Sequence, residues 1–408
     1  MNSITFSKYA IYLLPILLVT GPFLSDLAVS LSAILYLIHS FQKKNKFYKN
    51  KFFIIFLSFW IFLCINSVLS ESFISIKSSI FYIRFGLFLL LVNYFLDRDL
   101  QFAINLKKII LFVFMFLVLD SLYQFIFGNN LIGFPKDGRI SSLFGDEKIL
   151  GSFIVKIIPV YISLYFFGKK NIKLDYHIFF ISICSIILIL LSGERSALGL
   201  FIIYIILLLF TTIQNKKKLI TYIIVFFSIL FFTIINSSRL QNRFLIELKD
   251  QFFYTNEVNE IKKVYMFTQA HHYLYLTAYN MFKAKPITGH GTKTFRENCK
   301  KPEYKYLNHP YSCNTHPHNF YIQMAAENGI IGLTFLLFLY ILLIKDFLKN
   351  FFLKNFKNKL LNLSVSSNLV MLWPLIPHGN FFNNWLSILI YFNLSIYIYL
   401  KYKYIPHN

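Results

Sequence analysis

Apolar stretches long enough to span a bilayer as helices, about 20 residues each, recur along most of the chain. This pattern predicts an all-α integral membrane protein with about twelve transmembrane helices. The predicted helices cover residues 8–24, 26–41, 52–70, 78–97, 109–127, 148–168, 176–193, 196–213, 219–237, 318–345, 360–377 and 383–400.

The apolar pattern is interrupted for a long distance only once. We therefore divide the chain into transmembrane helices 1–9 (residues 1–237), one large loop (residues 238–317) and transmembrane helices 10–12 (residues 318–408). Within the loop we expect a helix from about Ile261 to Phe282, lying either along the membrane interface or against the mouth of the bundle. The glycines of the turn that follows, from Lys285 to Gly291, permit positive φ angles.

The net charge of +23 has a distribution that points to membrane topology. Lysines and arginines gather in alternate short connections, at residues 43–51, 98–108, 169–173, 216–218, 345–359 and 401–403. With a cytoplasmic N-terminus and twelve helices, each of these segments lies in the cytoplasm, as the positive-inside rule requires. The large loop then lies on the other side, and nucleic acid is not an expected partner. The first apolar stretch has no clear cleavage site and is expected to remain as an anchor.

The four cysteines fall into two groups. Cys64 and Cys184 lie in apolar stretches, which is typical of small core residues. Cys299 and Cys313 lie in the large loop, where an oxidising compartment would permit a disulfide. Such a bond would contribute about 3 kcal/mol in the chain-entropy model. The sequence leaves open whether the two cysteines pair.

Histidines concentrate where the large loop meets the tenth predicted helix. His318 is placed at or near the first turn of that helix, where the helix dipole favours a neutral imidazole that can accept a proton. Asn319 and His316 are its neighbours. A capping or interfacial histidine without chemistry is the alternative. A metal site is a third possibility, but no cysteine or carboxylate is placed to complete one, and we predict neither a metal nor a cofactor.

Two arginines in short connections are candidates for binding an anion. Arg195 lies in the turn between the seventh and eighth predicted helices, where a guanidinium suits bidentate contact with phosphate. A lipid-headgroup anchor or an ion pair with Glu194 would equally explain it. Arg139 precedes the sixth predicted helix, which Asp146 and Glu147 are expected to cap.

Two further charged residues lie inside apolar stretches. Arg84 and Asp120 would be costly in hydrocarbon without partners, so we expect them to pair with each other; a place in a polar substrate path stays open. The chain has no P-loop, no GxSxG elbow and no paired-carboxylate motif. Hydrolytic and nucleotide-driven mechanisms therefore have no support in this sequence.

Several of these segments together resemble the O-antigen ligase family of bacterial membrane enzymes. The family signature has a histidine, then asparagine, serine or glutamine, nine residues, a glycine, two residues, and then glycine, threonine or tyrosine; His318, Asn319, Gly329 and Gly332 fit it. The turn that carries Arg195 also looks like a family segment. The resemblance extends over about residues 115–345 through further segments, namely Asp120 to Gln124, Gly138 to Gly145, and Pro286 to Phe295.

The chain departs from the family pattern at one position. The family usually has an arginine about fifteen residues before the proline of the loop turn, and counting back from Pro286 reaches His271, beside His272. Either histidine would take the place of a cationic contact to phosphate. Otherwise an arginine elsewhere does so, and the candidates are Arg239, Arg243 and Arg296.

The resemblance implies a GT-C-like helical plan and a glycosyltransferase without a cofactor. The enzyme would move a glycan from undecaprenyl diphosphate to a sugar hydroxyl of lipid A–core, at the periplasmic face of the bacterial inner membrane. His318 would be the general base. Arg195, with Arg139, would hold the diphosphate. The substrate-binding candidates beside them are His271, His272, His316 and Asn319.

Three other functions compete with this interpretation. A polymerase that joins repeat units on the same lipid carrier needs the same groups and differs only in its acceptor. A transporter of lipid-linked glycans would have charged residues along a central path and no need of a large loop. A membrane scaffold without catalytic activity would tolerate the loss of His318 and Arg195. Membrane lipids are expected contacts in every case.

Overall fold

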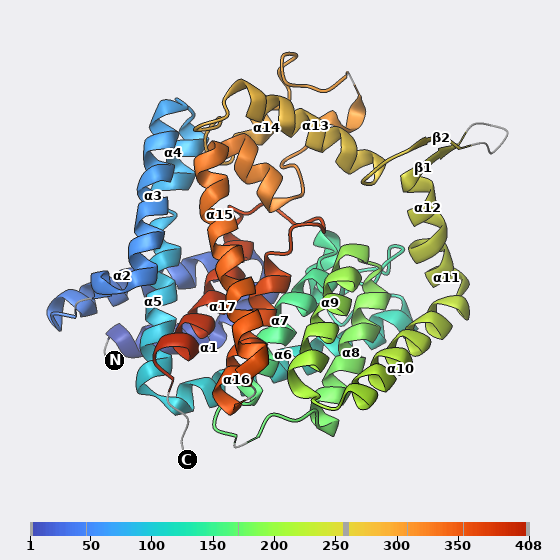
Figure 1. Ribbon diagram of the computed structural model, residues 1–408, viewed down its shortest axis with the longest axis horizontal. Coiled ribbons are helices and arrows are strands. Elements are labelled where there is room, and N and C mark those ends of the chain that lie inside the picture. Colours follow the sequence, from blue (N-terminus) through green and yellow to red (C-terminus); the bar gives the residue numbers. More distant parts are fainter. Residues whose placement is uncertain are drawn as a thin grey trace.

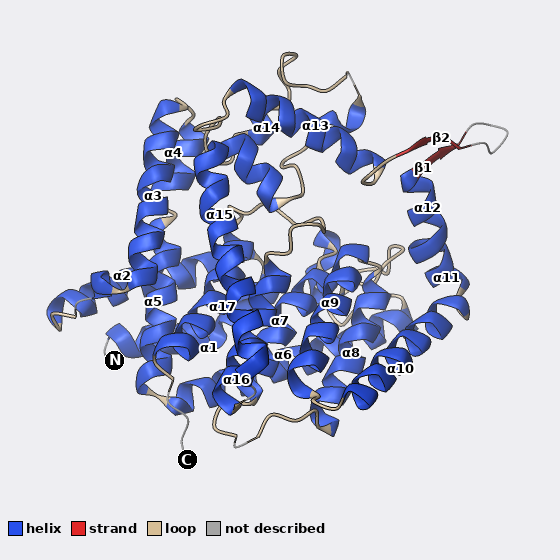
Figure 2. Ribbon diagram, viewed as in Figure 1, coloured by secondary structure: helices blue, strands red, loops and turns tan. Residues whose placement is uncertain are grey.

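The computed structural model describes residues 3–45, 47–169, 171–255, 261–307, 309–353 and 355–404. Figure 1 and Figure 2 show that these residues form an almost entirely helical molecule with one small two-stranded hairpin. The elements are α1 (Ser3–Thr20), α2 (Pro22–Gln42), η1 (Phe47–Lys49), α3 (Lys51–Leu69), α4 (Phe73–Ile80), α5 (Ile83–Arg98), α6 (Leu100–Phe127), η2 (Ser142–Glu147), α7 (Leu150–Tyr165), α8 (Tyr176–Ser192), α9 (Arg195–Thr212), α10 (Lys216–Ile235), α11 (Ser238–Gln241), the π-helical η3 (Asn242–Ile246), α12 (Glu247–Phe252), β1 (Phe253–Thr255), β2 (Ile261–Val264), α13 (Gln269–Ala284), α14 (Phe295–Asn298), η4 (Pro310–Ser312), α15 (Phe320–Leu353), α16 (Phe356–Met371) and α17 (Asn384–Tyr402).

Each predicted apolar stretch coincides with a helix, and the fourth is divided between α4 and α5. Within the described residues, seven helical segments have the length and hydropathy to cross a membrane. These segments are α2, α3, α4 with α5, α6, α9, α10 and α15. The number is five below the predicted twelve because α1, α7 and α8 offer shorter apolar segments, and because α16 and α17 bury several asparagines and serines. This composition is that of a multi-pass membrane protein.

Burial separates the central helices from those at the rim. Almost every side chain of α7 and α17 is buried, as is every residue of α16 from Leu360 onward. In α10, by contrast, Leu230 alone is buried, although the helix is apolar all round. Such a surface is stable only where the surrounding medium is itself apolar, so α10 is suited to contact with lipid.

The segment between α10 and α15 is largely structured. Figure 1 shows α11 and α12 rising along one side of the molecule to the β1–β2 hairpin, and α13 lying across the end of α15. The helix predicted from Ile261 to Phe282 begins later, at Gln269, because residues 261–264 pair with β1 as an antiparallel strand. The hairpin thus connects α12 to α13, and these two helices line the site described below.

Two close backbone contacts fix this segment to α15. Gly329 interrupts α15 with a φ of 60°, and a Cβ atom there would lie 2.2 Å from the carbonyl oxygen of Ile287. The amide of Ile330 donates to the carbonyl of Pro286 at 2.8 Å, and the amide of Gly291 donates to the carbonyl of Glu327 at 2.7 Å. Glycines at these positions allow the backbone of residues 286–291 to approach the backbone of α15 this closely.

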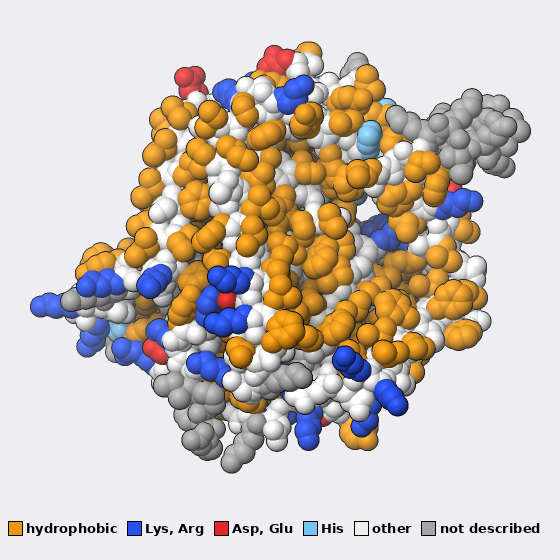
Figure 3. All heavy atoms as spheres, in the orientation of Figure 1, with side chains coloured by type: hydrophobic (Ala, Val, Ile, Leu, Met, Phe, Trp, Pro, Cys, Tyr) orange, Lys and Arg blue, Asp and Glu red, His pale blue; other side chains and the backbone are white. Residues whose placement is uncertain are grey.

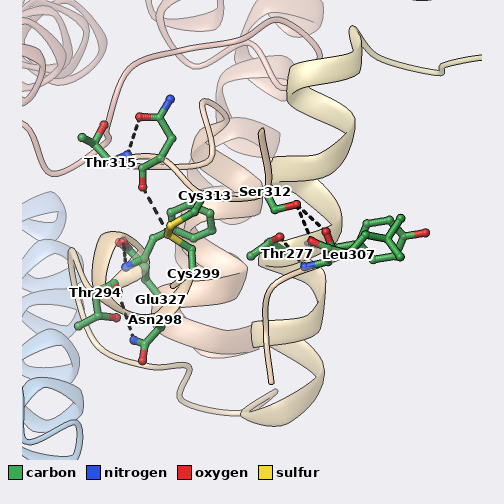
Figure 4. The surroundings of a disulfide bond; sticks show 12 residues. Thr277, Thr294, Asn298, Cys299, Leu307, Ser312, Cys313, Thr315 and Glu327 are labelled. Carbon is green, nitrogen blue, oxygen red and sulfur yellow. Dashed lines mark hydrogen bonds between the residues drawn. A yellow bond between two sulfur atoms is a disulfide. The ribbon is translucent and has the colours of Figure 1, made fainter. Parts of the chain in front are cut away.

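The buried carboxylate of Glu327 strengthens the same junction. It accepts hydrogen bonds from the amides of Lys293 and Phe295, at the start of α14. A disulfide joins Cys299 to Cys313 nearby, with 5.1 Å between their Cα atoms (Figure 4). Around Cys299, a small apolar cluster includes side chains of α13 and α15. The segment is therefore anchored to α15 by backbone, carboxylate and disulfide contacts.

The expected pairing of Arg84 with Asp120 is wrong. Arg84 forms an ion pair with Asp26 of α2, at 2.9 Å, because the start of α5 lies beside that helix. Asp120 instead accepts hydrogen bonds from the amide of Leu131 at 2.9 Å and from the hydroxyl of Ser142 at 2.5 Å. It fixes the connection that leads to η2.

The expected capping of the sixth predicted helix by Asp146 and Glu147 is also wrong. These residues belong to η2, which ends before α7 begins, and neither forms a side-chain cap there. The cap comes from Glu194, in the turn between α8 and α9. Its carboxylate accepts hydrogen bonds from the amides of Gly151 at 2.6 Å and Ser152 at 3.1 Å.

Candidate functional site

A cavity of about 650 Å³ opens between the ends of α7 and α9, the α16–α17 connection, and helices α12 and α13. Figure 3 shows a hollow in this region of the surface, between α13 and α12, with Lys or Arg side chains at its back. The charged and imidazole side chains that line the cavity are Arg139, Lys156, Glu194, Arg195, Arg243, His271, His316, His318 and His378. The cavity therefore collects basic groups from segments that are far apart in the sequence.

Three histidines meet on one wall of this cavity. The ring of His318 lies 4.1 Å from the ring of His316 and 5.7 Å from that of His271, between centroids. His318 has a φ of 57°, an unusual value for a residue with a side chain. It directly precedes Asn319, whose side chain caps α15. The structure thus brings together three of the histidines that the sequence singled out.

Burial keeps these histidines neutral. It lowers the pKa of His318 below its ordinary value. Burial, and then the neighbouring His318, lower the pKa of His316 to about 3 and that of His271 to about 4. An imidazole that is neutral at pH 7 has a free lone pair and can accept a proton. His318 can therefore accept a proton from a group that enters the cavity.

Asn319 has a structural position just outside the cavity. Its side-chain oxygen accepts hydrogen bonds from the amides of Tyr321 at 3.0 Å and Ile322 at 3.1 Å, which caps α15. Its amide nitrogen donates to the carbonyl of Pro374 at 2.7 Å. Asn319 therefore fixes the start of α15 against the α16–α17 connection, and so fixes the place of His318.

Arg195 is held by α12 and the residues before it. Its Nε donates to the carbonyl of Arg243 at 2.9 Å, and its Nη1 to Gln251 at 2.7 Å. Its Nη2 lies 2.5 Å from the carboxylate of Glu247, which Arg243 also contacts. The ion pair of Arg195 with Glu194 that the sequence left open is thus replaced by one with Glu247. Two guanidinium groups share a single carboxylate oxygen at the edge of the cavity.

Of two further residues expected in the site, Arg139 lies in the cavity wall and His272 lies outside the cavity. Arg139 lines the cavity, and no described carboxylate forms an ion pair with it. His272 does not line the cavity; its ring packs against Tyr265, 5.1 Å away between centroids. Successive side chains of a helix point about 100° apart, so His271 and its neighbour face different surroundings. His272 is therefore left out of the site.

Sequence reasoning missed several residues of this site. Lys156, Glu247 and His378 were not among the candidates, and Glu194 was considered only as a partner of Arg195. Lys156 could have been found from the sequence, because a single lysine inside an apolar stretch usually either has a function or pairs with another charged residue. Among the described residues, no group of three histidine, cysteine or acidic side chains has the arrangement needed to hold a metal ion.

Comparison with known proteins assigns this region to a family. Residues 180–337 match the model of the O-antigen ligase family, over a range that runs from α8 into α15. The match includes Arg195, Arg243, His271 and His318. No curated protein matches the chain. Residues 180–337 are thus a domain of the O-antigen ligase family, and several of them line the cavity.

Proposed function

We propose that the protein transfers a glycan from undecaprenyl diphosphate to a sugar hydroxyl of lipid A–core. The observation that carries the proposal is the common cavity of His318 and Arg195. A neutral base and a group of cations are what this reaction needs, because it removes a proton from the acceptor and leaves negative charge on the diphosphate. The family match supports a glycan ligase or polymerase.

The chemical step is a substitution at the anomeric carbon of the donor. His318 takes the proton of the acceptor hydroxyl as its oxygen forms the new glycosidic bond. The bond from the anomeric carbon to the phosphate oxygen breaks, and the diphosphate leaves with the electron pair. Arg195, assisted by Arg139, stabilises the charge on the leaving group. His316 and His271 pack beside the base and help to exclude water from it.

The proposed location is the periplasmic face of the bacterial inner membrane. The lysine-rich connections lie at the ends of the helices opposite to α13, including the starts of α3 and α10 and the end of α17. By the positive-inside rule, this distribution supports a periplasmic position for α13 and the cavity. There the apolar helices next to the cavity would contact the polyprenyl chain, and the cavity would receive the diphosphate.

The second candidate function is a polymerase that joins repeat units on the lipid carrier. It would use the same base and the same cations, and the family match supports it equally. The two functions differ in which hydroxyl enters the cavity beside His318. The product therefore distinguishes them.

Reconstitution of the purified protein tests the proposal. The protein in lipid vesicles would receive undecaprenyl-diphosphate-linked glycan and lipid A–core, and the products would be read by mass. Glycan on lipid A–core is the expected result. Longer glycans that remain on the carrier would replace the ligase by the polymerase. The absence of both products would contradict both candidates and favour a transporter or a scaffold.

A further inference from the structure

Lys156 is the most deeply buried cation of the cavity. It lies on α7, where the surrounding side chains are apolar, and only 7% of its surface is exposed. Its ammonium group reaches back one helical turn and donates a hydrogen bond to the carbonyl of Ser152 at 3.0 Å. Since side chains on a helix point toward its N-terminus, the charge lies near the start of α7, where Ser152 also lines the cavity.

No carboxylate of the described residues forms a direct ion pair with Lys156. Glu194 is near it, but the oxygens of Glu194 accept hydrogen bonds from Gly151 and Ser152 at the start of α7. Two of the three N–H groups of the lysine therefore have no described acceptor. A buried charge in this condition is costly, and such groups in membrane proteins usually bind a substrate or an ion.

The positive charge of Lys156 also affects His378, a neighbouring residue of the cavity wall. It lines the cavity with 5% of its surface exposed, and its Nδ1 atom is buried without a hydrogen-bond partner. Burial, and then the nearby charge of Lys156, lower the pKa of His378 to about 3. The histidine is thus neutral, and it does not add to the positive charge of the cavity.

The charges around the cavity leave an excess of two. Four basic side chains line it, namely Arg139, Lys156, Arg195 and Arg243. Two carboxylates oppose them: Glu247 pairs with Arg195 and Arg243, and Glu194 caps α7. Arg139 and Lys156 are the two cations without an ion pair to a described carboxylate. A diphosphate esterified at both ends carries two negative charges, which equals this excess.

We propose that Lys156 is a further substrate-binding residue, which together with Arg139 holds the diphosphate group of the lipid-linked donor. This inference rests on the proposed function and deepens it, because it names the residues that hold the two phosphates of the donor. The guanidinium of Arg139 suits two oxygens of one phosphate. The ammonium of Lys156 acts as a compact point charge on the other.

The test measures binding of two probes, undecaprenyl diphosphate and undecaprenyl monophosphate, to the whole protein in nanodiscs. The wild type should bind the diphosphate more tightly than the monophosphate. Lys156→Met should lower the affinity for the diphosphate about tenfold or more, the usual effect of losing a charged hydrogen bond. Lys156→Arg should restore most of it. Transfer assays should show a larger rise in KM for the donor than fall in kcat.

Lys107→Met is the matched control. Lys107 is a half-buried lysine on α6 that lies outside the cavity, beside Tyr165. Its loss should leave the affinity for both probes unchanged. Thermal unfolding of each variant separates a loss of binding from a loss of structure, and Lys156→Gln serves if Lys156→Met does not fold.

The outcomes separate this inference from the proposed function. If the wild type does not bind undecaprenyl diphosphate, the proposed donor is wrong and the inference falls with it. If the wild type binds it and a folded, uncharged variant at Lys156 binds it equally well, this inference alone is overturned. Equal affinity of the wild type for the monophosphate and the diphosphate would also overturn it.

Discussion

The backbone carbonyl of His318 accepts a hydrogen bond from the backbone amide of His378, with 2.8 Å between nitrogen and oxygen. This bond ties the proposed base to the connection between α16 and α17, 60 residues further along the chain. It also stabilises the left-handed backbone of His318, which would otherwise cost about 1–2 kcal/mol. The backbone that carries the imidazole is thus fixed at the cavity wall by a segment other than α15.

The rate of transfer should depend on pH in the direction set by His318. The base must be neutral to accept a proton, and burial lowers its pKa. Transfer should therefore persist as the pH falls to 6.5 and decline only below it. A profile of kcat/KM against pH measures this. An acid limb with an apparent pKa above 6.5 would be incompatible with a buried, neutral His318 as the base.

Replacing Arg195 by lysine should reduce kcat/KM about 10- to 100-fold, although the charge is kept. Each guanidinium nitrogen has its own acceptor on or near α12, and an ammonium group can neither keep that arrangement nor present a fork to phosphate. Steady-state kinetics with the donor varied give the measurement. Arg84→Lys is the control, because Arg84 pairs with Asp26 away from the cavity. Wild-type turnover in Arg195→Lys would remove Arg195 from the site.

Glu247→Gln should strengthen donor binding. Glu247 contacts both Arg195 and Arg243, so its carboxylate takes donors that a phosphate would otherwise receive. Removing its charge adds a third uncompensated positive charge to the cavity, and the KM for the donor should fall several-fold. Raising the salt concentration should reduce the difference, since the gain is electrostatic. A higher KM in this variant would mean that Glu247 acts chiefly by orienting the arginines.

Gly329→Ala should detach the α13–α14 segment from α15 and abolish transfer. The new Cβ atom would meet the carbonyl of Ile287 at 2.2 Å, a contact that only backbone movement relieves. Gly128→Ala is the matched control: Gly128 also has a positive φ, but its Cβ atom would meet nothing within 4 Å. It should cost only about 1 kcal/mol. Limited proteolysis of the segment compares the two variants; equal resistance would contradict the role given to Gly329.

The helices were predictable because their apolar stretches are long. The number of membrane spans stays a prediction, because the apolar pattern does not distinguish a helix such as α16, whose buried asparagines and serines bond within the bundle, from a helix that faces lipid. The β1–β2 pairing was missed because a short strand depends on its partner, here residues 253–255, instead of on a local pattern. It displaced the start of the predicted helix to Gln269.

Site residues that belong to a local sequence motif could be predicted. Those that reach the site from distant segments of the chain could not. His318 and Arg195 stand in recognisable local sequences. Their partners do not: Glu247 lies 52 residues from Arg195, and His378 lies 60 residues from His318. Arg84 shows the same limit, because two charged residues in apolar stretches suggested a pair, whereas its partner Asp26 is on α2.

The most direct test of the account compares the wild type with His318→Ala in the reconstituted transfer reaction, after both proteins are shown to bind undecaprenyl diphosphate equally. The wild type should produce glycan on lipid A–core, and His318→Ala none, or less than about a hundredth of the rate, as expected for loss of a general base. Near-normal transfer by His318→Ala would contradict the central claim.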